Sequence, residues 1–202
     1  MPPNENPPVN LIYALPSIVA LLNVAQLFPK SQPLEVELGC GDASFLVEYA
    51  QRHPDRNFIG VERLLGRIRK LDRKGRRAGL TNLRGVQIES SYFLKYLLPP
   101  RSVAALHIYF PDPWPKKRHH KNRLINESFP QLAAAALALG GVVYFRTDDK
   151  DYFVQITEVF GAAKKFQQVE TPVDLAEQLT DFEREFLERG IRTLRAAYRL
   201  LA

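Results

Sequence analysis

Short apolar runs alternate with amphipathic segments along most of this chain. The runs are typical of buried strands, and the segments between them have the spacing of helices that bury one face. This repeated alternation predicts an α/β fold, a doubly wound, mostly parallel, Rossmann-like sheet of about seven strands. The predicted strands are residues 34–38, 57–62, 82–88, 103–110 and 142–146, and the predicted helices are 43–52, 64–78, 92–98, 124–139 and 152–162.

The two ends of the chain carry weaker patterns. Residues 1–10 hold four prolines, whereas 15–28 is apolar at helical spacing, with Pro16 suited to a first helical turn. Residues 166–169 and 193–200 are predicted to add a strand pairing, with a short helix near 182–188. We see no linker or repeat that divides the chain. We therefore expect one domain over 1–202, in which 1–33 is an extension with one helix and 34–202 is the core.

Basic residues are concentrated in two segments. The chain has 28 Lys and Arg against 22 Asp and Glu, a net charge of +6. Residues 63–77 hold eight basic side chains and one acid, Asp72, and residues 116–123 hold a second cluster that includes His119 and His120. Each segment follows a predicted strand, which favours a polyanionic partner such as a nucleic acid. For the first cluster taken alone, a merely solvated helix face is the alternative.

Other classes of protein fit the sequence poorly. The single cysteine, Cys40, excludes a disulfide framework, and no His pairing suggests a metal site. No apolar run approaches the roughly 20 residues of a membrane span. The Pro-rich start does not resemble a signal peptide. We expect a cytoplasmic protein without a metal.

Acidic residues end three successive predicted strands beside a glycine turn. Glu37 precedes Gly39 and Gly41 at the first strand, Glu62 ends the second, and Glu89 with its neighbour Ser90 ends the third. Glycines let the backbone approach a ligand, and an acid at the second strand commonly binds ribose hydroxyls. Ser44 stands where a dinucleotide site needs its third glycine, which disfavours NAD. The pattern favours S-adenosylmethionine, whose cationic amino acid part suits Glu37.

A proline-rich segment follows the fourth strand. Asp112 lies among three prolines and Trp114, just before the second basic cluster. Proline biases the residue before it to extended geometry, so we expect a stiff backbone around Asp112, at the sheet edge where open α/β folds bind ligands. An acid, an aromatic face and nearby cations suit a flipped nucleobase. Trp114 is equally suited to packing in the wall of such a site.

These motifs together resemble the bacterial tRNA (guanine-N7)-methyltransferases, the TrmB family. The most specific is Pro-Asp-Pro-Trp-x-Lys-x-Arg-His at 111–119, and the others lie at 37–41, 57–62, 146–148 and 180–183, the last followed by Gly190. The resemblance, over about 34–191, implies a class I methyltransferase fold and methylation of variable-loop guanosine 46 of tRNA. It implies that the cofactor binds to Glu37, Gly39, Gly41, Glu62, Glu89, Ser90 and Asp112, that Asp112 is catalytic, and that the substrate binds to Lys116, Asp148, Thr180, Phe182 and Glu183.

Four departures from the family pattern stand out. This chain has Ala43, Glu89 and Asn122 at positions where family members often have a glycine, an aspartate and an arginine. The basic residues that are usual near the N-terminus of the family are missing from 1–15. The last departure puts an N-terminal grip on tRNA in doubt.

Guanine N7 carries no proton at neutral pH, so methylation there needs alignment and not a general base. Asp112 is then expected to orient the guanine edge and to stabilise the cationic product.

Two alternatives to this interpretation stay open. One is a methyltransferase for an exocyclic amine of another nucleic acid, and the other is a non-catalytic RNA-binding module on the same fold. Local alternatives also exist for single residues. Thr180 and Glu183 have the spacing of a capping box, and Asp148 or Asp149 could cap the next helix.

Overall fold

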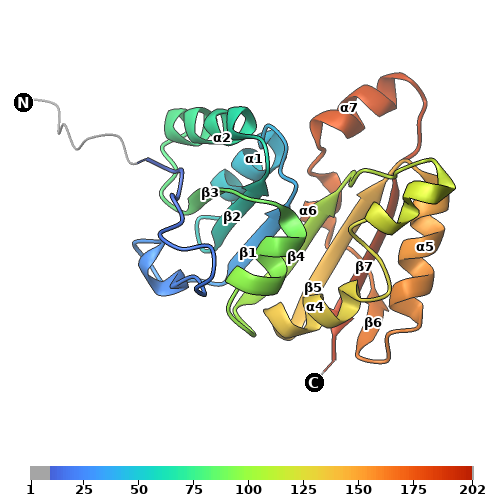
Figure 1. The fold of residues 1–202 in the computed structure, drawn as a ribbon. Helices are drawn as coiled ribbons and strands as arrows, with labels where there is room; N and C mark the ends of the chain where they lie inside the picture. The colour runs from blue at the N-terminus through green and yellow to red at the C-terminus, as the bar shows by residue number, and fades with distance from the viewer. Residues whose placement is uncertain (1–9, 202) are drawn as a thin grey trace, which may run out of the picture.

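A seven-stranded sheet forms the centre of the computed structural model, which describes residues 10–201. The strand order is β3-β2-β1-β4-β5-β7-β6, with β7 antiparallel to its two neighbours and the remaining pairs parallel (Figure 1). The strands are β1 (Leu34–Leu38), β2 (Asn57–Glu62), β3 (Leu83–Gln87), β4 (Val103–Tyr109), β5 (Leu137–Thr147), β6 (Phe166–Val169) and β7 (Leu194–Leu200). The predicted mostly parallel, doubly wound sheet is confirmed.

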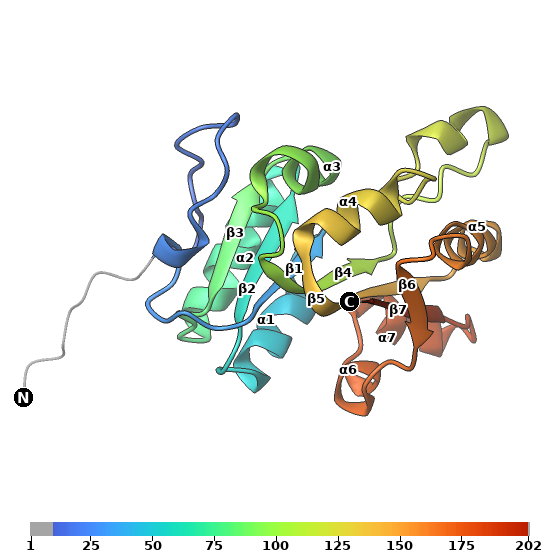
Figure 2. The ribbon, with the colours of Figure 1, turned by 90° about the horizontal axis from the view of Figure 1, so that it is seen from below.

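Helices cover both faces of the sheet, and Figure 2 shows the two layers. One face packs against α1 (Ser44–Arg52), α2 (Leu65–Arg77), α6 (Val173–Glu177) and α7 (Asp181–Glu188). The other packs against α3 (Ser90–Tyr92) with its π-helical continuation η2 (Phe93–Leu97), α4 (Phe129–Ala136) and α5 (Lys150–Gly161). Two short 3-10 helices complete the chain, η1 (Val24–Gln26) and η3 (Lys117–Asn122). Within residues 10–201, no helix is both long and apolar enough to span a bilayer.

The two faces of the sheet differ in polarity. Alternate strand residues such as Val36, Leu106 and Phe145 are buried in an apolar core under α3, α4 and α5. Their sequence neighbours point the opposite way, because successive strand side chains alternate between faces. On that second face the central strands bury ionisable groups, among them Glu37 and His107. The first face is called the apolar face below, and the second the polar face.

Two predicted elements differ from the structure. The helix predicted over 15–28 is wrong, since only η1 forms there. Leu22 N donates to Leu97 O and Tyr92 Oη to Ile18 O, so the segment lies against α3 and η2 instead of forming an α-helix. The helix predicted over 124–139 is confined to α4, and Gly140 lies inside β5 with a φ of 76°. Glycine adopts that conformation freely, and the pairing of β5 with β4 is irregular near this residue. Gly140 was expected to end a helix, but it lies within a strand.

Candidate active site

The glycine turn lies at the carboxyl end of β1, beside the end of β2. Gly39 N and Cys40 N both donate to Val61 O, at 2.8 and 3.0 Å. Gly39 and Gly41 have φ values of 80° and 55°, and a Cβ at either would meet no atom within 4 Å. The turn therefore leaves open space above its backbone. Ala43 stands at a position where the family that this chain resembles often has glycine. Its φ of 61° is also positive, so its backbone is strained in a way that glycine would avoid.

A cavity of about 70 Å³ lies over this turn. Residues from three distant parts of the chain line it, namely the turn itself, the end of β4 and the start of α7. The structure thus brings five predicted site residues together with seven that the predicted site did not include. The predicted residues are Glu37, Gly39, Gly41, Thr180 and Phe182, and the added ones are Cys40, Asp42, Ser44, Phe45, Tyr109, Phe110 and Asp181.

Glu37 has an unusual environment within this cavity. Its side chain is buried, and its Oε2 has no hydrogen-bond partner among the described residues. Burial raises the pKa of Glu37 to about 8, although the positive charge of Arg146 opposes this shift. A buried carboxylate without a donor is costly, so its environment favours a ligand that brings positive charge or hydrogen-bond donors. Glu37 therefore fits the ammonium group of an amino acid.

The other two strand-end acids are engaged locally. Glu62, also buried, accepts from Leu64 N at 2.9 Å and pairs with Arg67 at 3.4 Å, which fixes the start of α2. Glu89 is exposed and caps α3 by accepting from Ser91 N and Tyr92 N, and these bonds lower its pKa despite partial desolvation. Ser90 follows it as the first residue of α3. Neither acid lines the 70 Å³ cavity, and their cofactor contacts stay predictions.

The loop around Asp112 is strained where extended geometry was expected. Phe110 and Trp114, which each precede a proline, have φ values of 50° and 45°. The expectation of extended backbone at these residues is therefore wrong. Asp112 Oδ1 accepts from Trp114 N at 3.0 Å, and Phe110 N donates to Arg146 O at 2.8 Å. Strained residues held by such bonds are common at active sites.

Arg123 anchors this loop from its far end. It was predicted to belong to the basic surface, but its side chain is buried and that prediction is wrong. Its guanidinium donates to Pro113 O at 2.7 Å, Gln155 Oε1 at 2.7 Å and Asp151 Oδ2 at 2.6 Å. Because all three of these contacts use the guanidinium, Arg123 ties the proline-rich loop to α5 and is not free to bind RNA.

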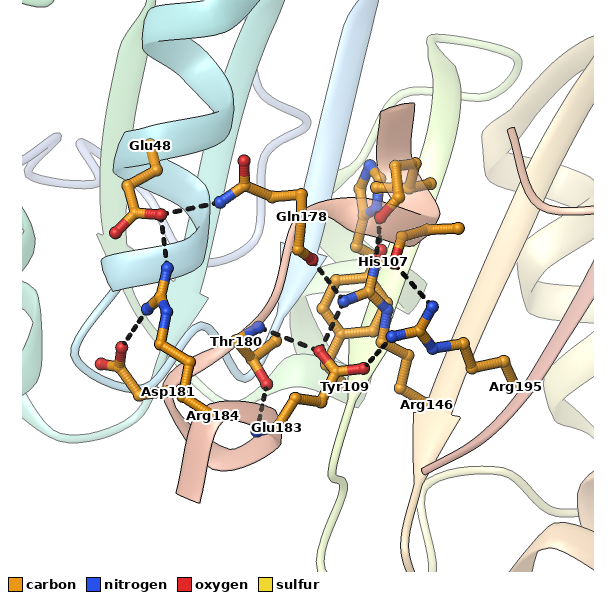
Figure 3. A network of polar contacts seen from close by, with 12 residues as sticks. Glu48, His107, Tyr109, Arg146, Gln178, Thr180, Asp181, Glu183, Arg184 and Arg195 are labelled. Carbon is orange, nitrogen blue, oxygen red and sulfur yellow. Dashed lines mark hydrogen bonds and ion pairs between the residues drawn. The ribbon is translucent and has the colours of Figure 1, made fainter. Parts of the chain in front are cut away.

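Arg146 joins the polar face to α7, as Figure 3 shows. Its buried guanidinium donates to Gln178 O at 2.7 Å, Leu175 O at 2.5 Å and Glu183 Oε2 at 2.6 Å. It also lies 4.4 Å from the centroid of the Tyr109 ring. Its contacts hold α6 and α7 against the sheet, which places the start of α7 over the glycine turn.

Thr180 and Glu183 form the capping box that their spacing suggested. Thr180 Oγ1 accepts from Glu183 N at 3.1 Å, and Glu183 Oε2 accepts from Thr180 N at 2.9 Å. Glu183 is buried, and its other oxygen pairs with Arg195 at 2.5 Å. The Arg146 charge and these bonds lower its pKa against the opposing effect of burial. Both oxygens are therefore used within the protein, and direct substrate contact by Glu183 stays a prediction.

A buried polar chain on the same face was missed by the sequence analysis. His107 Nδ1 lies 2.7 Å from Tyr109 Oη, and His107 Nε2 lies 2.7 Å from Glu35 Oε2. Glu35 also pairs with Arg56 at 2.7 Å, and these partners lower its pKa although burial acts in the opposite direction. The sequence did contain a signal for this chain of contacts. Polar residues two apart within a buried strand, as at 35 and 37 or 107 and 109, lie on the same face of the sheet.

The remaining predicted substrate residues lie on the surface near the carboxyl edge. Lys116 is exposed at the start of η3, whose Lys117, Arg118 and Lys121 are also exposed. Asp148 is exposed directly after β5, while its neighbour Asp149 is the residue that caps α5. The structure does not bring Asp112, Lys116 or Asp148 into the 70 Å³ cavity.

Comparisons with known proteins agree with this architecture. Residues 31–200 match the family model described as "Putative methyltransferase". The 16S rRNA methyltransferase KamB superposes with a TM-score of 0.63 at 15% identity, covering 88% of this chain and 92% of that one. The 30S ribosomal A1408 methyltransferase of an uncultured bacterium gives 0.61 at 15% identity, with 84% and 88% covered. At such identities these two likenesses establish the class I methyltransferase fold alone.

Sequence relatives are more specific. The tRNA (guanine-N(7)-)-methyltransferase of Syntrophotalea carbinolica is 35% identical over 178 residues, which are 86% of this chain and 77% of that protein. The enzyme of that name from Nitrosospira multiformis is 35% identical over 89% of this chain and 78% of its own length. The one from Thermotoga maritima is 33% identical over 85% of this chain, which spans only 55% of it. The chain belongs to the tRNA (guanine-N7)-methyltransferase family.

Proposed function

We propose that this protein transfers a methyl group from S-adenosylmethionine to N7 of a guanosine in tRNA, at position 46 of the variable loop. The observation that carries the proposal is the buried Glu37 carboxylate, which lines a cavity beside an open glycine turn. Family membership supplies the substrate, since the relatives named above are tRNA (guanine-N(7)-)-methyltransferases.

The residues present fit the cofactor. Glu37 would hold its ammonium group, while the backbone of Gly39 and Gly41 would allow close approach. Glu62 at the end of β2 would accept from the ribose hydroxyls, and Glu89 with Ser90 would lie near the adenine. When bound, S-adenosylmethionine supplies an activated methyl group.

Asp112 has the main role toward guanine in this proposal. Its Oδ1 is already oriented by Trp114 N, and its exposed position leaves the carboxylate able to accept from guanine N1–H and the N2 amino group. These donors distinguish guanine from adenine. The carboxylate also stabilises positive charge as it develops on the methylated base. No proton leaves N7, so no residue is required as a general base.

The exposed cations and Phe182 complete the site. Lys116, Lys117 and Arg118 are suited to phosphates on either side of the target nucleotide. Phe182 is 56% exposed and packs against Phe110, with ring centroids 5.4 Å apart. The exposed part of this ring would offer a stacking surface beside the cavity. Asp148 is an exposed acceptor at the same edge.

The test is methylation of unmodified tRNA with labelled S-adenosylmethionine, followed by digestion to nucleosides. We expect 7-methylguanosine. Asp112→Ala should reduce the single-turnover rate roughly 100-fold or more, by analogy with loss of one oxyanion-hole donor. Asp112→Asn should also be damaging, because an amide does not neutralise a cation.

Asp55→Ala is the matched control, since Asp55 is an exposed acid in the loop between α1 and β2, at the opposite edge of the sheet. It should leave the rate unchanged. Label recovered in a methylated adenine or cytosine, or a normal rate with Asp112→Ala, would overturn the assignment.

A further inference from the structure

A second and larger concavity lies apart from the cavity over the glycine turn. Its volume is about 530 Å³, within the range of about 300–1,000 Å³ of ligand pockets. One wall is α3 with η2, and the other is the stretch from Leu124 into α4. The two walls lie side by side in Figure 2. We refer to this concavity as the α3–α4 groove; it is lined by Glu89, Ser91, Tyr92, Lys95, Tyr96, Leu124, Asn126, Ser128, Gln131 and Leu132.

Aromatic and basic side chains gather on the first wall. The Tyr92 and Tyr96 rings pack with centroids 4.8 Å apart, and Lys95 Nζ lies 4.9 Å from the Tyr96 centroid. Tyr96 is 46% exposed, so one part of a large aromatic ring stays open to solvent. Lys95 and Tyr96 belong to the π-helical turn η2, and such turns occur frequently at functional sites.

The groove lies between two segments that the proposed function already uses. It begins at Glu89, two residues after β3, and its second wall begins two residues after the basic helix η3. The exposed cations of η3 would therefore hold a phosphate backbone that runs toward the groove. Glu89 adds a negative charge at one end, but the N-terminal N–H groups of α3 take up its carboxylate.

An aromatic stack with a nearby lysine and an amide side chain, such as that of Gln131, is typical of sites for unpaired nucleotides. We propose that the α3–α4 groove binds an unpaired nucleotide of the RNA substrate, whose base stacks on Tyr96 and whose phosphate pairs with Lys95. The groove is distinct from the cavity over the glycine turn, because the two share no lining residue. This inference rests on the proposed function, and it adds a second contact to the target guanosine.

The test compares equilibrium binding of unmodified tRNA to the whole protein and to variants across a salt titration. Tyr96→Ala should weaken binding roughly 5- to 100-fold, the range for loss of one stacked base, and leave the salt dependence unchanged. Tyr96→Phe and Tyr96→Trp should retain binding because they keep an aromatic face. Lys95→Ala should lower the slope of log affinity against log salt by about one, as expected for one lost phosphate contact.

Two controls match these variants at exposed positions that do not line the groove. Leu139→Ala removes an exposed side chain from β5, and Lys165→Ala removes an exposed cation just before β6. Both should bind tRNA as the unaltered protein does. Binding of S-adenosylmethionine, measured by isothermal titration, should be unchanged in Tyr96→Ala and Lys95→Ala.

Each contrary outcome has a separate meaning. If Tyr96→Ala binds tRNA normally while the unaltered protein methylates it, the groove proposal is wrong. If Tyr96→Ala weakens S-adenosylmethionine binding and not tRNA binding, the groove holds the cofactor's adenine, and the proposal is also wrong. If the unaltered protein neither binds nor methylates tRNA, the proposed function fails first.

Discussion

The two faces of one sheet are built on different principles. On the apolar face, strand residues such as Val36, Ile108 and Phe145 pack against α3, α4 and α5. On the polar face, the same strands bury Glu37, His107 and other ionisable groups under α1, α6 and α7. Alternation within a strand explains both, since each face takes every second residue.

Because the two faces differ in this way, the apolar face contributes mainly to stability and the polar face mainly to function. Packing of the apolar face depends on volume and burial, which tolerate exchange of similar side chains. The polar face depends on specific partners, because each buried charge must find an opposite charge or a donor. Glu37 is the exception, because its buried Oε2 has no hydrogen-bond partner among the described residues and the residue lines the cavity. We infer that this unpartnered acid lies where a cationic ligand would bind.

Removal of Arg146 is expected to destabilise the polar face more than any other change considered. Arg146→Ala leaves Glu183 without its buried cation and frees α6 from the sheet. We expect the free energy of unfolding to fall by about 3–5 kcal/mol, the usual cost of removing one partner of a buried pair. Urea denaturation at pH 7 measures this loss.

Two further variants show whether charge is the cause. Arg199→Ala removes an exposed arginine from β7 and should change stability by less than about 0.5 kcal/mol. Arg146→Met combined with Glu183→Gln should recover part of the loss, because neither member of the buried pair stays charged and Arg195, which loses its carboxylate partner, is partly exposed to solvent. Equal stability of Arg146→Ala and the unaltered protein would contradict the proposed role of the network.

A milder test uses the pH dependence of cofactor binding. The pKa of Glu37 is about 8 in the ligand-free protein, so the carboxyl group is protonated at pH 7. An ammonium group beside it would lower that pKa, and binding would release a proton. Affinity for S-adenosylmethionine should then rise with pH, by up to roughly tenfold per unit, as far as about pH 8, and should fall at higher pH because the ligand's ammonium group loses its proton there.

Isothermal titration in buffers of different ionisation enthalpy measures this proton release. In Glu37→Gln, the only pH dependence of affinity that remains should come from the ligand's own amino group, which titrates in the same pH range. The same shift predicts a stability effect without ligand. Folding raises the pKa of Glu37 above its usual 4.5, so protonated Glu37 favours the folded state. This contribution to the free energy of unfolding is complete below pH 4.5 and is lost as pH rises to about 8. Flat binding between pH 6 and 8 would contradict the assignment of Glu37.

The smallest expected effect concerns the apolar face. Ile108→Val removes one buried methyl group beside His107 in β4 and should cost about 0.5–1.5 kcal/mol. The loss should be the same at pH 6, 7 and 8, since no ionisable partner is involved. Cofactor and tRNA binding should not change. A pH-dependent loss, measured by urea denaturation at each pH, would show that the two faces are not independent.

Much of this architecture could be predicted from the sequence alone. Apolar runs and helical spacing determined the order of strands and helices, because both patterns are local and have fixed periods. Strand order then placed Glu37, Glu62 and Glu89 at one edge, since parallel strands end on the same side. The resemblance of the 111–119 motif correctly indicated the family.

Only the tertiary structure decided which polar groups meet. Glu35 pairs with His107, 72 residues away, and Arg146 with Glu183, 37 residues away. Arg123 lies in a basic run that suggests a surface, yet it is buried because Pro113 and α5 supply its partners. The physical reason is that burial of a charge depends on donors and acceptors brought together by folding, and no local pattern records where they lie.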